Sequence, residues 1–417
     1  MAIPKESRLS LYLYSNYKFG GLLRMKQVRM GIIGIGVMGS RHAEYLFEGE
    51  VKNAVLAAVC DIKPNRLEWA KEKFGEAVAR FDKAEELIAS GLVDAVLIAV
   101  PHYQHAEYAI CAFQHDLHVI CEKPAGVYAR QVEEMNAVAE KSGKVFSMMY
   151  NQRTNPYFLR LHELVKSGEL GELRRMTWIV TNWYRSQSYY DSSDWRATWD
   201  GEGGGIMINQ CPHNLDMWQW ICGVPNRIRS FCQFGRYHTI EVEDSVTVYA
   251  EYGNGMTAQF ISTTGEPQGS NRLEITADRG KVVIEETGNN EFKFTYWEFE
   301  QSEREFNATY AGGFGEPKAR ITEFVPDHMF PYFDGHKKIT QNFVNAILYG
   351  EELIAPGPEG LKAVQIFNAI YLSSWTDGWV NVPVDEEVYM ARLDEQKKKS
   401  TIKKSSRTIE MDIATSK

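Results

Sequence analysis

A run of three glycines, Gly203 to Gly205, is followed by two side chains that could act together on one hydroxyl group. Asn209 and His213 are four residues apart, so a helix that begins near Gly205 would place both on one face. Histidine titrates near neutral pH and can take the proton of a hydroxyl as that hydroxyl is oxidised, while asparagine can hold the hydroxyl in line. Pro212 lies inside this stretch, so the helix is expected to bend or to begin later. A single histidine is more often a structural hydrogen-bonding group, but this spacing favours a catalytic role for His213.

Lys123 is a second candidate for direct chemistry. It lies in the sequence Cys121-Glu122-Lys123-Pro124, at the end of a predicted strand, where open α/β sheets form their ligand crevice. The lysine could donate a hydrogen bond to a reacting oxygen and stabilise negative charge on it, and Pro124 would fix the local turn. A surface salt bridge between Glu122 and Lys123 explains the same residues equally well.

A glycine-rich turn predicts a binding site for a dinucleotide. The sequence Gly34-Ile35-Gly36-Val37-Met38-Gly39 follows an apolar strand and opens a helical segment. The first glycine permits a tight turn, the second lets the backbone approach a pyrophosphate, and the third lets the helix pack closely on the strand. The helix N-terminus adds free N–H groups and the positive end of a dipole.

Asp61 closes the next apolar strand, about 22 residues after Gly39. A carboxylate at this place can accept hydrogen bonds from the adenosine ribose and would repel a 2'-phosphate. The neighbouring Ile62 supplies no compensating cation, so the sequence predicts NAD rather than NADP. A helix cap is the alternative role for Asp61. The predicted cofactor-binding residues are Gly34, Gly36, Val37, Met38, Gly39, Asp61, Ile62, Val100, Pro101, His105, Glu122 and Lys123.

The segment from Trp178 to Trp199 is rich in aromatic residues, interleaved with arginines and aspartates. Aromatic faces stack on the C–H faces of sugars while polar groups take the hydroxyls, so this segment could line a sugar pocket. Packing in a core or an interface is an equally good interpretation of any single ring. The predicted substrate-binding residues are Arg153, Trp183, Tyr184, Trp195, Arg196, Asn209 and His213.

The elements that must position these residues fall into two classes. From residue 28 to 150, apolar runs of strand length alternate with helical stretches, which predicts a doubly wound parallel sheet, the Rossmann domain of an α/β protein. From 151 to 395, period-two segments joined by tight turns predict an open, mostly antiparallel sheet in an α+β domain for substrate binding and oligomerisation. Helical patterns at 157–166, 336–349 and 359–375 complete it. Residues 1–27 are interpreted as a flexible extension, and 396–417 as a charged, disordered tail.

Composition excludes several classes of function. A chain of 417 residues exceeds the size of one usual core, which agrees with two domains, and its formal charge of −9 offers no basic surface to nucleic acid. Six cysteines at irregular spacings are interpreted as reduced thiols of a cytoplasmic protein. We expect no membrane span, because no apolar run reaches about 18 residues. We also expect no metal, because neither the pair His102 and His105 nor the pair His115 and His118 has a completing ligand set.

Together, GIIGIGVMG, CEKP and the glycine run followed by N-x-x-x-H-x-x-D resemble the Gfo/Idh/MocA family, the glucose-fructose oxidoreductases, inositol dehydrogenases and their relatives. The resemblance covers about residues 28 to 384. It implies a Rossmann domain followed by an open sheet that commonly forms an oligomer interface. It also implies that Lys123 is the catalytic lysine and His213 the catalytic histidine.

One position departs from the family pattern. Many members carry an aspartate where this chain has Asn209, and an asparagine can hydrogen-bond but cannot share a proton or carry charge. The proton relay through this position is therefore in doubt, and His213 is the one obvious base.

The resemblance implies an NAD-dependent oxidoreductase that transfers a hydride between nicotinamide and a secondary hydroxyl of a sugar or glycoside. The leading hypothesis is oxidation of the glucose C3 hydroxyl of a glycoside, because the segment from Asp194 to Trp220 resembles members that act on glycosides. Three alternatives stay open. They are a cyclitol or aldose dehydrogenase, a redox-neutral NAD-dependent glycosidase and a non-catalytic dinucleotide sensor. A homo-oligomer is expected through the open sheet.

Overall fold

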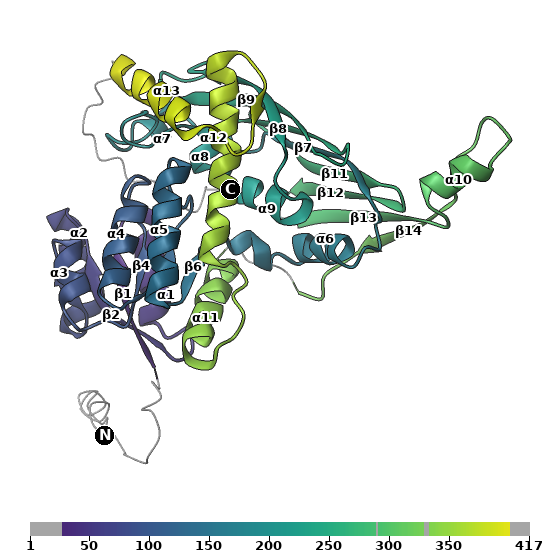
Figure 1. Cartoon of the computed structure of the whole chain (residues 1–417). Coiled ribbons are helices and arrows are strands. Elements are labelled where there is room, and N and C mark those ends of the chain that lie inside the picture. Colours follow the sequence, from purple (N-terminus) through teal and green to yellow (C-terminus); the bar gives the residue numbers. More distant parts are fainter. Residues whose placement is uncertain (1–26, 289–290, 329–332, 401–417) are drawn as a thin grey trace.

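The computed structural model of the chain describes residues 27–288, 291–328 and 333–400. Figure 1 shows two sheets: helices cover the first, in purple and blue, and the second, in teal and green, extends away from it. The long helix α12 (Gly360–Thr376) contacts helix α5 beside the first sheet and strand β8 of the second. The extension predicted for residues 1–27 lies, except for its last residue, outside the described residues.

The first sheet confirms the predicted Rossmann arrangement. Its strands are β1 (Val28–Ile33), β2 (Ala54–Cys60), β3 (Ala79–Phe81), β4 (Ala95–Ile98), β5 (His118–Cys121) and β6 (Phe146–Met148). They are all parallel and follow the order β3-β2-β1-β4-β5-β6. All four residues of β4 are buried, because both faces of the sheet are covered. Strand β3 was not predicted, since three half-buried residues carry no periodic signal.

Parallel strands bring the candidate cofactor residues to one edge of this sheet. The connecting helices are α1 (Val37–Phe47), α2 (Pro64–Phe74), α3 (Ala84–Ala89), α4 (Gln104–Gln114) and α5 (Ala129–Ser142). The loops that follow β1, β2, β4 and β5 begin at the carboxyl ends of neighbouring strands. These loops contain Gly34, Asp61, Val100 and Glu122, so the fold places four separate stretches of sequence around one crevice.

The second sheet is mostly antiparallel, as predicted. Its strands are β7 (Leu173–Val180), β8 (Arg227–Phe234), β9 (Glu243–Glu251), β10 (Thr257–Thr263), β11 (Asn271–Ala277), β12 (Gly280–Gly288), β13 (Glu291–Phe299), β14 (Ala319–Phe324) and β15 (Val380–Asn381). Their order is β14-β13-β12-β11-β7-β10-β9-β8-β15, and only β7 and β10 pair in parallel. The edge strands β14 and β15 were not predicted.

The remaining helices follow the first sheet in the chain. They are α6 (Pro156–Lys166), α7 (Gln187–Tyr190), α8 (Ile206–Asn209), α9 (Pro212–Cys222), α10 (Glu303–Thr309), α11 (Asp334–Tyr349) and α13 (Glu386–Lys399), with 3-10 turns at Gly75–Ala77, Asn151–Thr154 and Gly357–Glu359. In Figure 1, α10 projects from the far end of β13 and β14. No helix among the described residues is both long and apolar enough to cross a membrane.

Helix α13 extends into the first four residues of the predicted tail. Residues 396–399 belong to α13, whose N-terminus is capped by the Asp385 side chain through the backbone N–H of Val388. Lys397 is held there because its ammonium lies 4.3 Å from the centre of the Tyr103 ring. Residues 401–417 lie outside the described part of the chain. All six cysteines are described and none forms a disulfide.

Candidate active site

The glycine turn after β1 has the geometry that a pyrophosphate needs. Gly34 has φ of +85°, and a Cβ there would lie 2.6 Å from the carbonyl oxygen of Ala99. A Cβ on Gly39 would lie 1.8 Å from the carbonyl oxygen of Gly34, so only glycine allows α1 to pack this closely. A Cβ on Gly36 would meet no atom within 4 Å. The middle glycine therefore faces open space beside the first turn of α1, whose N–H groups have no partners within the helix.

Asp61 lies directly beside this turn. Its two carboxylate oxygens accept hydrogen bonds from the backbone N–H groups of Ile35 and Lys63, each at 2.9 Å. Its neighbour Ile62 is 80% exposed. Arg66, which lies five residues after Asp61, donates a hydrogen bond through Nε to the carbonyl oxygen of Ile35 at 2.7 Å. Arg66, in the first turn of α2, is therefore a nearby cation that the prediction of NAD from Ile62 did not include. The ribose-binding role of Asp61 stays a prediction.

His105 is buried and binds backbone rather than open space. Its Nδ1 lies 2.6 Å from the carbonyl oxygen of Pro124, and its Nε2 lies 2.8 Å from that of Val100. Burial lowers the pKa of this imidazole, although both carbonyls oppose the change. His105 therefore joins the loops that follow β4 and β5, and its contact with the cofactor stays a prediction.

Glu122 and Lys123 do not form a surface salt bridge. Glu122 is buried, and its Oε1 lies 2.7 Å from Nε2 of His42, a residue of α1. Burial alone would raise the pKa of Glu122, but His42, His336 and Lys123 outweigh it and lower that pKa to about 2. The second oxygen accepts the backbone N–H of Lys123 at 3.2 Å. An ionised, anchored glutamate thus precedes the candidate lysine.

Lys123 reaches from the first sheet to the glycine-run segment. Its Nζ donates a hydrogen bond to the backbone carbonyl oxygen of Asn209 at 2.8 Å. Burial lowers the pKa of Lys123, and the carboxylates of Glu122 and Glu202 act in the opposite direction. The two predicted catalytic residues Lys123 and Asn209 are therefore in contact, and their catalytic roles stay predictions.

The helix expected from Gly205 onward is broken into two. Helix α8 ends at Asn209, and α9 begins at Pro212, where proline needs no N–H partner. His213 is the second residue of α9. Its Nδ1 is shielded from solvent, and neither ring nitrogen has a hydrogen-bond partner among the described residues. Burial, followed by the charge of Lys123, lowers the pKa of His213 well below its ordinary value of 6.5, so the ring is uncharged at neutral pH.

The glycine run is tightly enclosed, which explains its composition. A Cβ on Gly204 would lie 2.1 Å from the hydroxyl oxygen of Tyr371, and a Cβ on Gly205 would lie 2.1 Å from the carbonyl oxygen of Glu243. The Glu243 carboxylate accepts the backbone N–H groups of Gly205 and Met207 at 2.9 and 3.0 Å. Strand β9 and helix α12 therefore hold α8, and with it Asn209, in place.

One carboxylate of this site was missed by the sequence analysis. Glu202 is 1% exposed, and its side chain accepts a hydrogen bond from the Asn209 amide. Its backbone carbonyl oxygen lies 3.1 Å from Nδ1 of His102. The sequence did not predict a contact between positions 202 and 209, because the glycine run between them follows no regular helix or strand spacing.

The predicted substrate-binding aromatics lie in different surroundings. The Trp195 ring centre is 5.7 Å from that of His102, and the Arg196 guanidinium lies 4.8 Å from the Trp195 ring centre. Trp183 is half-buried, and its Nε1 is shielded without a partner among the described residues. Tyr184 is 48% exposed. Trp178 and Trp199, which bounded the aromatic segment, are buried core residues.

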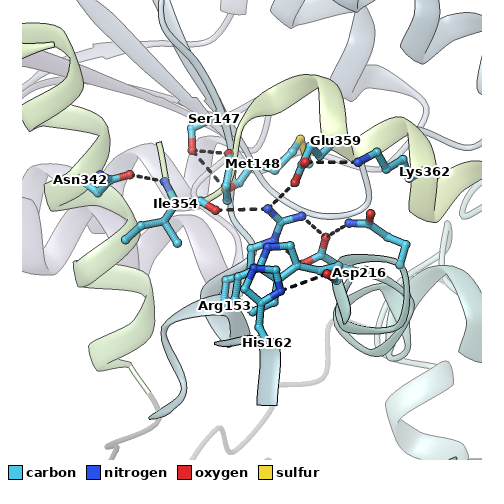
Figure 2. A network of polar contacts seen from close by, with 12 residues as sticks. Ser147, Met148, Arg153, His162, Asp216, Asn342, Ile354, Glu359 and Lys362 are labelled. Atoms are coloured by element: carbon cyan, nitrogen blue, oxygen red, sulfur yellow. Dashed lines mark hydrogen bonds and ion pairs between the residues drawn. The ribbon is translucent and has the colours of Figure 1, made fainter. Parts of the chain in front are cut away.

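Arg153 lies in a buried ionic network that includes Asp216 of α9 (Figure 2). Its guanidinium donates two hydrogen bonds to Asp216 at 2.6 and 2.9 Å and one to Glu359 at 2.5 Å. A further hydrogen bond reaches the carbonyl oxygen of Ile354 at 3.2 Å. Because all three guanidinium nitrogens are occupied by protein, the structure gives Arg153 a structural role, which corrects its selection as a substrate-binding residue.

The two parts of the chain match two models of one protein family. Residues 28–150 match the oxidoreductase family with an NAD-binding Rossmann fold, and residues 158–283 match the GFO/IDH/MocA C-terminal domain. The chain belongs to the Gfo/Idh/MocA oxidoreductase family. It is an NAD-binding oxidoreductase, which confirms the predicted family, enzyme class and cofactor. Among the described residues, no group of three or more histidine, cysteine, aspartate or glutamate side chains is arranged to hold a metal.

Several relatives of this Gfo/Idh/MocA protein are named as dehydrogenases. A myo-inositol 2-dehydrogenase of Thermotoga maritima is 31% identical over 345 residues, covering 81% of this chain and 93% of that protein. A D-glucoside 3-dehydrogenase of Escherichia coli is 29% identical, covering 55% of this chain and 68% of that protein. The structure of the WlbA dehydrogenase of Chromobacterium violaceum, solved with NADH and UDP-GlcNAcA, is 25% identical with a TM-score of 0.73. The match covers 86% of this chain and 97% of the WlbA chain.

Proposed function

We propose that the protein is an NAD-dependent dehydrogenase that oxidises a secondary hydroxyl of a sugar, a glycoside or a cyclitol. The observation that carries the proposal is the meeting of Lys123 with the segment that holds Asn209 and His213. The lysine comes from the sheet edge that carries the glycine turn, and it binds Asn209 at 2.8 Å. The names of the two dehydrogenase relatives support ring alcohols as substrates.

Each side chain has a separate task in the proposed reaction. The Lys123 ammonium donates a hydrogen bond to the hydroxyl oxygen on the carbon that is oxidised and stabilises negative charge on that oxygen. His213 is uncharged at neutral pH, and it takes the hydroxyl proton at Nε2, because Nδ1 is shielded. Asn209 holds a hydroxyl through its amide without exchanging a proton. NAD, held by the turn from Gly34 to Gly39, supplies the electron acceptor.

The leading substrate is a glycoside that is oxidised at the C3 hydroxyl of its glucose. Trp195 and Arg196 support this choice, because they place an aromatic face and a cation next to His102 and Glu202. The name of the Escherichia coli relative, a D-glucoside 3-dehydrogenase, agrees with it.

A cyclitol is the second candidate. The Thermotoga maritima relative, named a myo-inositol 2-dehydrogenase, matches a larger share of this chain than the glucoside enzyme does. A cyclitol has vicinal ring hydroxyls like a sugar, so Lys123, Asn209 and His213 could act on it in the same way.

A panel of substrates separates these candidates. The purified protein with added NAD is followed at 340 nm against glucose, myo-inositol, methyl glucosides and aryl glucosides, and each product is identified by mass. We expect NADH together with a product two mass units lighter than the glycoside. NADH with myo-inositol alone would favour the cyclitol, and release of an aryl group without NADH would indicate a redox-neutral glycosidase. NAD binding without any turnover would contradict the proposal and favour a sensor.

We also propose that the chain associates with copies of itself through the second sheet. Phe231 of β8 and Ile321 of β14 are exposed large apolar side chains on this sheet. Light scattering on the purified protein should give a multiple of the chain mass of 47.6 kDa. A mass equal to one chain would contradict this assembly.

A further inference from the structure

The loop before the glycine run buries a carboxylate against the candidate catalytic residues. Oε2 of Glu202 accepts the backbone N–H of Ala197 at 2.5 Å, and Oε1 lies 3.6 Å from a guanidinium nitrogen of Arg196. Oε1 also accepts the side-chain amide of Asn209. Removing a carboxylate from water is costly unless it is paired and hydrogen-bonded, and these three partners meet both conditions for Glu202.

The contact with Glu202 decides which way the Asn209 amide points. An ionised carboxylate only accepts hydrogen bonds, so Asn209 must present its Nδ2 to it. The amide oxygen Oδ1 is then directed away from the Glu202 carboxylate. Asn209 therefore offers an acceptor, rather than a donor, to a bound molecule.

The same carboxylate balances charge near the lysine. Besides Glu122 and Glu202, the charged or titratable groups around Lys123 are Arg185, Arg196, His102, His105, Cys211 and His213. Burial, Arg196 and Arg185 lower the pKa of Lys123, whereas the carboxylates of Glu122 and Glu202 raise it. Glu122 is already engaged by His42, whereas Glu202 lies on the Asn209 side.

We propose that Glu202 is a positioning residue of the dehydrogenase site. Its carboxylate orients Asn209 so that Oδ1 accepts a hydrogen bond from a ring hydroxyl next to the one being oxidised, and it supplies the negative charge that Asn209 lacks. This selects substrates with two vicinal hydroxyls, one for Lys123 and His213 and one for Asn209. The inference rests on the proposed function.

An exchange of charge between the two positions tests this inference. Glu202→Gln removes the charge and leaves the Asn209 amide free to turn, so kcat/KM should fall about 100-fold with NAD affinity unchanged. Asn209→Asp alone places two carboxylates in contact and should also lower kcat/KM. In the double variant, the amide introduced at position 202 can donate to the carboxylate introduced at position 209, so kcat/KM should recover at least about tenfold over Glu202→Gln.

Matched variants separate this role from a structural one. Glu241→Gln also removes a carboxylate that accepts a backbone N–H in this region, that of Trp199, and should leave kcat/KM unchanged. Should Glu202→Gln not fold, Glu202→Asp keeps the charge but withdraws it from Asn209, and the same loss of kcat/KM is expected. Activity of Glu202→Gln within threefold of the parent, or a double variant no better than the product of the single effects, would overturn the inference.

A second readout needs no substrate, so failure of the proposed function can be told apart from failure of this inference. Lysines are reductively methylated with ¹³C-formaldehyde and a borane reductant, and the Lys123 resonance is assigned by its absence from Lys123→Arg. Without the Glu202 charge, Lys123 should titrate at lower pH. Equal titration of Lys123 in the parent and in Glu202→Gln would refute the charge-balancing role, whatever the enzyme oxidises.

Discussion

Replacing Arg153 with methionine tests the structural role that its contacts assign. The guanidinium and Asp216 are 1% and 0% exposed, and the two nitrogen–oxygen hydrogen bonds are 2.6 and 2.9 Å long. Removing one partner of a buried ion pair leaves the other charge without compensation, which costs about 3–5 kcal/mol of unfolding free energy. Methionine keeps the apolar part of the side chain, so the loss reports mainly on the ion pair.

The control is Arg175→Met, whose guanidinium pairs with Glu274 at 2.6 Å but is 40% exposed. An exposed pair contributes about 0–1 kcal/mol, so urea unfolding followed by tryptophan fluorescence should separate the two variants clearly. In folded Arg153→Met protein, KM for the substrate should stay within twofold of the parent. Unchanged stability with a KM raised tenfold or more would refute this reasoning and return Arg153 to the substrate pocket.

The other predictions concern the cofactor turn and the base. His213→Ala should lower kcat at least about 100-fold while NAD affinity, measured by fluorescence titration, stays the same; unchanged turnover would refute the base. Because the pKa of His213 lies well below 6.5, its uncharged form persists on acidification, so kcat/KM should stay flat as pH falls through 6.5. Gly39→Ala should lower both the stability of the protein and its NAD affinity, because the new Cβ would lie 1.8 Å from the carbonyl oxygen of Gly34. Gly36→Ala should weaken NAD binding alone, because its Cβ would have no protein atom within 4 Å. Asp61→Ala should weaken NAD about tenfold and NADP less, and an unaltered NAD/NADP ratio would contradict the ribose role.

Much of the fold is predictable because its signals are local. Fully apolar runs predict the buried parallel strands, and period-two alternation predicts strands such as β8 and β13 with correct bounds. The pairing of β7 with β10 is not predictable in this way. These parallel strands are separated by 76 residues, between Val180 and Thr257, and no local pattern records such a contact.

The residues of the site are predictable only where each lies in a recognisable sequence motif. Lys123 and Asn209 are far apart in sequence but each lies in a recognisable pattern, and the structure brings them together. Glu202 belongs to no spacing pattern, because its contact with Asn209 depends on the left-handed turn through Gly203 and Gly204, which have φ of +85° and +157°. Arg153 was predicted to bind substrate, but residue type does not show that its guanidinium is hydrogen-bonded to the carboxylates of Asp216 and Glu359.

The most direct test of the central claim follows one hydrogen atom. The protein is incubated with NAD and with either methyl glucoside deuterated at C3 or myo-inositol deuterated at C2, and the NADH formed is analysed by mass spectrometry. The account predicts NADH one mass unit heavier with one of these substrates, and loss of that signal in His213→Ala. Consumption of the substrate without deuterium in NADH, or label transfer that is equally fast in His213→Ala, would contradict it.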